Sequence, residues 1–170
     1  MRVRLLTPDD APAVSVLWQA AVPVIKFLWP GPINENYTVE EARADLEHPD
    51  QWFPGFETDE GMLQGYLLVR DEPLPHVTDD RTEPYYEVQG RDGIRLVIWV
   101  MKMGLPLTAY GKAADALFDV GWFSRVPGQL CWGKAPRTVA KHSLRYLDRR
   151  FAHIEYKDYK TEWSVWWWNV

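Results

Sequence analysis

The hydrophobic and polar positions of the chain follow two periods in turn, which predicts a mixture of strands and helices. Residues 2–6 (RVRLL) alternate polar and apolar side chains, as a short strand does. Residues 52–70 hold two apolar runs around an acidic turn, Asp59-Glu60-Gly61, and predict an antiparallel hairpin. Residues 94–102 are rich in β-branched and aromatic side chains and predict a further strand.

Two helix starts are marked by capping residues. Thr7-Pro8-Asp9-Asp10 supplies an N-cap, a proline at the first helical position and a carboxylate at the third. The helix that follows has an apolar face made of Val14, Leu17, Trp18 and Ala21. Three prolines and a glycine between residues 22 and 36 predict that this helix has given way to a connection. Thr38-Val39-Glu40-Glu41 is a full capping box and predicts a second helix that ends near His48.

The stretch from Val97 to Trp122 joins a strand to a helix through a turn that contains glycine and proline. Its helical part places five apolar side chains on one face: Tyr110, Ala113, Ala114, Leu117 and Phe118. We expect this helix to open with Gly111 and Lys112. Free backbone N–H groups, the positive end of the helix dipole and an ammonium group would then meet, which makes the turn a candidate phosphate-binding site.

The C-terminal part is less regular at first. Between residues 124 and 138, either QLCWG or PRTVA can form the next strand, and periodicity does not choose between them. Residues 142–151 predict a helix, and residues 153–170 predict one or two strands that end in EWSVWWWNV. Both faces of this tail carry tryptophan, so we expect both to be covered, by helices or by another chain.

Composition narrows the class of protein. At 170 residues, 46% of them hydrophobic, the chain is expected to form one domain over residues 1–170. A net charge of −5 gives no electrostatic footprint for nucleic acid or for an anionic membrane, and we expect neither as a partner. No segment is expected to span a membrane. The single cysteine, Cys131, excludes an internal disulfide and fits the reducing cytoplasm.

Residues 71–92 are polar and contain three prolines. His76 and the acidic residues around it match no metal-ligand spacing, so we expect a solvated insertion or an interaction surface, and no metal. The ten tryptophans of the chain favour a Trp-rich core, with an assembly surface as the alternative.

Thr108, Gly111 and Ala113 read T-x-x-G-x-A, which resembles the Q/R-x-x-G-x-G/A element of GNAT-type N-acetyltransferases. The opening RLLTPDDAPAVSVLW, the third-strand sequence QGYL and the closing helix from His142 resemble that family in the same order. Four residues fit its closing pattern in register: Ser143, Arg145, Asp148 and Arg149. Four depart from it: Thr108 replaces Gln or Arg, Ala140 the usual Asn, Leu147 the usual Tyr, and Arg150 the Gly before Phe151.

The resemblance implies a single-domain α/β (α+β) fold. Its central sheet is mixed but mostly antiparallel, with about six to seven strands and about four flanking helices. The polar insertion at 71–92 would lie between the third and fourth strands.

The resemblance also implies transfer of an acetyl group from acetyl-CoA to an amine on a small molecule or a protein. In this family the fourth strand splays from its neighbour and pairs with the pantetheine arm through its backbone. Carried over, this assigns pantetheine contacts to Val100, Met101 and Lys102. The pyrophosphate contacts fall to Thr108, Tyr110, Gly111, Lys112 and Ala113.

The catalytic residues follow in the same way. Tyr146 lies one residue from the position of the family's tyrosine near the CoA sulfur, which makes it the candidate general acid. The candidate bases are Glu57, Glu83 and Glu87, although a surface carboxylate is the commoner role for each of them. Cys131 and His142 could form a nucleophilic pair, but Cys131 lies in an apolar run where a buried, inert thiol is the commoner state.

An alternative is a non-catalytic member of the same fold that serves as a structural or interaction protein. Small proteins of tailed phages, including internal virion components, look like degenerate acetyltransferases. This chain is similar to them in Thr108, Ala140, Arg150 and its WWW tail. In that case the Trp-rich C-terminus would bind an assembly partner or a second copy, and the protein would be found in the virion.

Overall fold

The computed structural model describes residues 2–77, 87–120, 129–137, 145–158 and 161–169. The strands are β1 (Arg2–Leu5), β2 (Gln51–Trp52), β3 (Pro54–Glu57), β4 (Leu63–Asp71), β5 (Ile94–Met101), β6 (Leu130–Pro136), β7 (Ala152–Asp158) and β8 (Thr161–Asn169). The helices are the 3-10 turn η1 (Pro8–Asp10), α1 (Ala11–Leu28), α2 (Val39–Glu47), α3 (Leu107–Val120) and α5 (Arg145–Arg150).

The strands form one sheet in the order β1-β3-β4-β5-β6-β8-β7, with β2 pairing the end of β4. Within the described residues only β5 and β6 run parallel, so the sheet is mixed and mostly antiparallel, as predicted. The short β2 brings the number of strands to eight. The predicted hairpin at 52–70 is confirmed as β3 and β4, and Gly61 in its turn has φ of +82°, which favours glycine.

The two predicted capping boxes are confirmed. The Asp10 carboxylate accepts a hydrogen bond from the Thr7 N–H at 2.8 Å, at the entry to η1 and α1. At α2, the Thr38 hydroxyl accepts from the Glu41 N–H at 3.1 Å, and the Glu41 carboxylate accepts from the Thr38 N–H at 2.7 Å. These bonds satisfy backbone donors that a helix start otherwise leaves without partners.

Helix α1 is longer than predicted. It continues through Pro23 to Leu28, where we had expected a connection. Val22 is buried and Ile25 packs against the core, so the apolar face of the helix extends past the proline. Burial of that face outweighs the hydrogen bond that Pro23 cannot donate.

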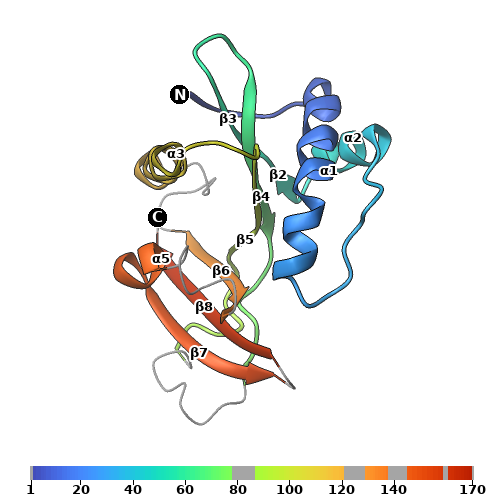
Figure 1. Ribbon diagram of the computed structural model, residues 1–170. Coiled ribbons are helices and arrows are strands. Elements are labelled where there is room, and N and C mark those ends of the chain that lie inside the picture. Colours follow the sequence, from blue (N-terminus) through green and yellow to red (C-terminus); the bar gives the residue numbers. More distant parts are fainter. Residues whose placement is uncertain (1, 78–86, 121–128, 138–144, 159–160, 170) are drawn as a thin grey trace.

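Figure 1 shows α1 and α2 on one side of β4 and β5, and α3 on the other. One core cluster lies under α1 and contains Val14, Leu17, Phe53, Tyr66 and Val100. A second lies on the α3 side and contains Trp52, Phe56, Leu67, Met101, Ala113 and Cys131. The central strands are therefore covered on both faces.

The structure shows which segment forms the strand after α3 and how many strands the C-terminal tail contains. The next strand is β6, which contains the LCWG of the first alternative and runs to Pro136. The tail forms two strands, and β8 pairs with both β6 and β7. Trp132 and Trp166 are each 1% exposed, the Trp166 indole N–H donates to Asp148 of α5 at 2.7 Å, and Phe151 stacks on Trp168. The described part of the tail thus packs within the chain.

The insertion is less solvated than predicted at its ends. Leu74 and Val77 are buried in a third cluster with Trp132, Ile154 and Val165. The Leu74 N–H donates to the carbonyl of Arg91 at 3.1 Å, which extends the β4–β5 pairing into the insertion. Residues 78–86 lie outside the described residues.

The segment Pro8–Leu28 has the length and apolar composition of a membrane span, in contrast to the prediction that no segment of the chain does. Core helices of soluble proteins have the same length and apolar composition. Its inner face packs on the sheet through Val14, Leu17 and Ala21.

Candidate functional site

Strands β5 and β6 begin as neighbours and then diverge. They pair only at Ile94↔Cys131, Arg95↔Trp132 and Leu96↔Gly133. Beyond this point β6 continues beside β8, whereas β5 continues beside β4 as far as Met101. Within the described residues, the segment 97–101 therefore has a strand neighbour on one side only, and we call it the open edge of β5. The predicted splay of this strand is confirmed.

The divergence begins at a bulge. Leu68 faces Ile98, but Val69 faces Leu96, so Val97 is an extra residue on β5. The extra residue of a bulge falls outside the regular ladder, and bulges are common next to active sites, where they re-aim a side chain or end the pairing. The Val97 bulge follows directly after the last pair with β6.

The direction of the backbone groups along the open edge follows from one hydrogen bond. The Lys102 N–H donates to the Gln64 carbonyl at 2.7 Å, which turns it toward β4. Because backbone direction alternates along an antiparallel pair, Val100 also faces β4, while Trp99 and Met101 face away. Of the three predicted pantetheine contacts, only Met101 presents its backbone to the open side. Trp99 also presents its backbone to the open side, which was not predicted. Which alternate residues face that side depends on the register between β4 and β5, and the sequence alone does not give this register.

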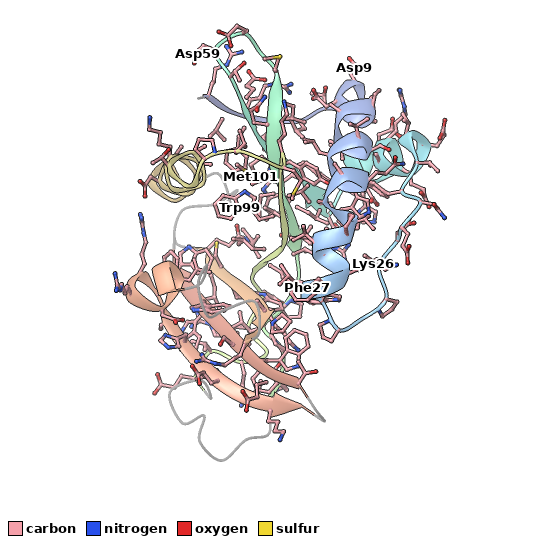
Figure 2. All side chains as sticks on the ribbon, viewed as in Figure 1. Asp9, Lys26, Phe27, Asp59, Trp99 and Met101 are labelled. Atoms are coloured by element: carbon pink, nitrogen blue, oxygen red, sulfur yellow. The ribbon has the colours of Figure 1, made fainter. Side chains whose placement is uncertain are left out.

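The side chains of the open edge divide between the two faces of the sheet. Val100 is buried under α1. Met101 belongs to the cluster under α3, and Trp99 is 37% exposed and stacks on Phe56 with 5.9 Å between ring centroids. Figure 2 shows Trp99 and Met101 along β5, between α3 and α1.

The turn after β5 leads into α3, which begins at Leu107, four residues before the predicted start at Gly111. Pro106 directly precedes the helix and was the sequence signal for its start. Thr108 therefore lies in the first turn and Gly111 in the second. Gly104, in the turn itself, has φ of +83°.

The pyrophosphate residues predicted from the T-x-x-G-x-A element are all helical. Ala113 is fully buried against the core, so it anchors α3 on the sheet. Thr108, Gly111 and Lys112 are exposed, and no atom lies within 4 Å of where a Gly111 Cβ would be. The side chain of Tyr110 lies outside the described residues. The free N–H groups of a helix belong to its first turn, which here begins at Leu107.

No protein-family model matches the chain, and no curated protein matches it. Solved structures do. A ribosomal-protein-alanine N-acetyltransferase from Brucella melitensis is 18% identical, with a TM-score of 0.57 over 93% of this chain and 95% of that one. A GNAT-family acetyltransferase from Listeria monocytogenes is 15% identical, with a TM-score of 0.55 over 99% and 94%. An acetyltransferase from Thermus thermophilus is 16% identical, with a TM-score of 0.58 over 100% and 98%.

The chain has the GNAT acetyltransferase fold. In this fold the candidate general acid, Tyr146, lies near the start of α5, and its side chain is outside the described residues. The Arg150 guanidinium of α5 lies 3.9 Å from the Asp115 carboxylate of α3. Residues 138–144, which include Ala140, His142 and Ser143, are outside the described residues as well.

Glu57 is only 1% exposed and is bound by two arginines. One carboxylate oxygen accepts from Arg2, with a 2.8 Å bond to its Nε, and the other accepts from Arg4 Nε at 2.8 Å. Arg4 also binds Asp10 at 2.7 and 2.8 Å. The hydrogen bond from Arg4 is the main cause that lowers the pKa of Glu57, which makes this carboxylate a weak base. These ion pairs therefore argue against the predicted role of Glu57 as a general base.

Glu87 is exposed and lies in a turn before β5. It is thus near the N-terminal end of that strand, while the open edge lies in the C-terminal half. Glu83 is outside the described residues. Among the described residues, no group of three or more His, Cys, Asp or Glu could hold a metal ion.

Cys131 is fully buried between β5 and β8, facing Ile94 and Trp168. Burial raises the pKa of its thiol to about 12. A neutral, inaccessible thiol is a poor nucleophile, which supports the prediction that Cys131 is buried and unreactive.

Proposed function

We propose that the protein is an acetyl-CoA-dependent N-acetyltransferase that acts on an amine. The observation that carries the proposal is the open edge of β5, where Trp99 and Met101 turn their backbone N–H and C=O groups away from β4. The pantetheine arm of acetyl-CoA contains two amides in an extended chain. Such a chain can add to an exposed strand edge as another strand would.

The pyrophosphate would bind at the start of α3. The N–H groups of Leu107 and Thr108 and the positive end of the helix dipole lie directly after the open edge. The ammonium groups of Lys102 and Lys112 are both exposed and lie on either side of this first turn in the sequence. The proposed anion site therefore spans residues 102–112, with its centre earlier than Gly111.

In the proposed reaction, the amine nitrogen bonds to the thioester carbonyl carbon and the carbon–sulfur bond then breaks. The backbone N–H of Val97 is our candidate donor to the oxyanion, because Val97 is the extra residue of the bulge and has no partner residue in the β4–β5 register. Tyr146 would give its proton to the leaving thiolate. The amine must lose a proton, and with Glu57 held by arginines, that proton passes to water or to a carboxylate such as Glu83.

The alternative, a non-catalytic structural protein, is less well supported. Its main sequence argument was the Trp-rich C-terminus as a partner surface. Trp166 is 1% exposed and Trp168 stacks on Phe151, so much of this surface is used within the chain. The open edge of β5 has no explanation in that alternative. A cytoplasmic location, where acetyl-CoA is available, fits the proposed activity.

The test is calorimetric titration with acetyl-CoA of the wild type and two variants of Thr108. Thr108→Glu places a carboxylate in the first turn of α3, and Thr108→Gln is its neutral match. We expect binding in the micromolar range, about −8 kcal/mol, that Thr108→Glu weakens at least tenfold and Thr108→Gln does not. Absence of binding by folded wild-type protein would reject the enzyme, and equal affinity of the two variants would reject this anion site.

The role of Tyr146 is tested separately, once a panel of amines has identified an acceptor. Tyr146→Phe should leave acetyl-CoA affinity unchanged and lower kcat on the order of 100-fold, with loss of the alkaline limb of the pH–rate profile. An unchanged kcat would remove Tyr146 from the reaction.

A further inference from the structure

The outer face of α1 carries a stripe of exposed apolar side chains. It consists of Ala13, Val16, Ala20, Val24 and Phe27. Phe27 is 89% exposed, Val16 66% and Val24 38%, and no charged residue interrupts the helix before Lys26. At 100° per residue these five positions fall within about 80° of one another and form an exposed stripe beside the buried face of the helix.

An outer face of this kind is unusual on a helix whose inner face already forms the core. Val14, Leu17 and Ala21 face the sheet, so α1 is apolar on both sides. The segment Pro8–Leu28 is apolar along most of its length, yet only 33% of its most apolar part is buried. Surface helices normally present polar residues outward, and a continuous exposed apolar patch marks a site that binds another protein, a membrane or a ligand.

We propose that the stripe binds the same stripe of a second copy of this chain, with the two α1 helices antiparallel. The spacings between successive members are three, four, four and three residues, which is symmetric about Ala20. In a two-fold dimer each contact occurs twice, so a residue before the centre meets one equally far beyond it. Ala13 then faces Phe27 of the second copy, Val16 faces Val24, and Ala20 lies at the axis.

The sizes of these side chains fit that arrangement. A small residue at the axis lets two helices approach to about 8 Å, the close end of helix packing distances. The largest side chain, Phe27, then lies over one of the smallest, Ala13. Antiparallel helices also bring opposite ends of their dipoles together.

The area of the stripe sets the strength of the contact. Its five side chains expose on the order of 400 Å² per copy, against about 800 Å² per partner in a stable interface. We therefore expect a weak dimer that forms with rising concentration. A lipid surface fits less well, because interfacial helices carry several basic residues on their flanks. The basic residue within α1 is Lys26, which pairs with Glu35 at 2.8 Å.

The test is sedimentation equilibrium over a concentration series that reaches about 1 mM. Wild-type protein should show a monomer–dimer equilibrium. Ala20→Arg puts two like charges against each other at the axis and should raise the dissociation constant at least tenfold. The matched control is Ala44→Arg, at an exposed alanine on α2, which should leave the dissociation constant unchanged.

A cross-link tests the geometry independently. Cys131, the native cysteine, is buried, so Ala20→Cys adds one accessible thiol per chain. With diamide as oxidant, the Ala20→Cys protein should form a disulfide-linked dimer at least tenfold faster than Ala44→Cys. A wild-type protein that stays monomeric, or equal cross-linking rates of the two cysteine variants, would overturn the proposal. So would a monomeric wild type that binds phosphatidylcholine vesicles, if Ala20→Arg abolishes that binding.

Discussion

Trp29 and Trp163 meet edge to face, with 5.4 Å between ring centroids and 72° between ring planes. Trp29 follows the last residue of α1, and Trp163 lies in β8, opposite Pro136 at the end of β6. The Lys134 ammonium lies over the Trp163 ring, 4.1 Å from its centroid. The pair therefore joins α1 to the C-terminal strands on the α1 side of the sheet, where β5 and β6 no longer pair.

Replacing Trp29 by alanine should weaken this connection. Because the ring is only partly buried, we expect the free energy of unfolding to fall by about 1–3 kcal/mol, less than for a core tryptophan. Urea unfolding of Trp29→Ala, Trp163→Ala and the double variant should give a coupling energy of about 0.5–1.5 kcal/mol. Additive effects would mean that the two rings contribute independently.

The sequence predicted those features of the fold, such as helix caps and tight turns, that depend only on residues close together in the chain. The capping box of Thr38 and Glu41 forms within one helical turn, and Gly61 adopts the positive φ of a tight turn. The order of strands and helices also followed from such local signals together with the family resemblance. The prediction that the first helix ends before Pro23 was wrong. The hydrogen bond lost at Pro23 is a local cost, and it is outweighed by burial of Val22 and Ile25 against distant parts of the chain.

The candidate site was predictable only in part, because it depends on pairing between distant strands. The splay of β5 was implied by the resemblance, yet which backbone groups face it follows from the register that pairs Gly65 with Met101. Glu57 is bound by arginine because β1 pairs with β3, which places Arg2 opposite Glu57. Nothing within the hairpin itself indicates those arginines.

The Glu57 cluster should make stability depend on acid pH. The pKa values of Glu57 and Asp10 are both lowered in the folded protein, chiefly by hydrogen bonds from Arg4. Their contribution is therefore complete above the unfolded pKa values, about 4, and is lost as pH falls through the lower folded values. We expect the free energy of unfolding to fall steeply below about pH 4.

Glu57→Gln isolates this effect. At pH 6 it should lower the free energy of unfolding by about 1–3 kcal/mol, toward the lower end because Arg2 is 65% exposed. The difference from the wild type should shrink between pH 5 and about pH 2. Glu60→Gln, which removes one negative charge from the adjoining turn, corrects for net charge, and a difference that stays constant with pH would contradict the pKa argument.

Cys131 should report on global unfolding through its reactivity. Its thiol is fully buried, and burial raises its pKa to about 12, so the thiol is neutral as well as inaccessible in the folded state at pH 8. Labelling by 5,5′-dithiobis(2-nitrobenzoate) should be at least 100-fold slower in the native protein than in 6 M guanidinium chloride. Rapid native labelling would place Cys131 in an accessible, activated environment and reopen its role as a nucleophile.

Gly65 is required by the close approach of β4 to the open edge of β5. A Cβ at this position would lie 2.6 Å from the Val100 carbonyl oxygen, a backbone atom that cannot move without shifting β5. Gly65→Ala should therefore lower the free energy of unfolding by about 1–3 kcal/mol and also weaken acetyl-CoA binding, because it displaces the open edge. Gly133→Ala is the matched control on β6, where the nearest atom would be Leu96 Cβ at 3.8 Å, an ordinary contact. Urea unfolding and calorimetry of the two variants separate the effects, and loss of stability in Gly65→Ala with unchanged acetyl-CoA affinity would mean that the cofactor does not lie along β5.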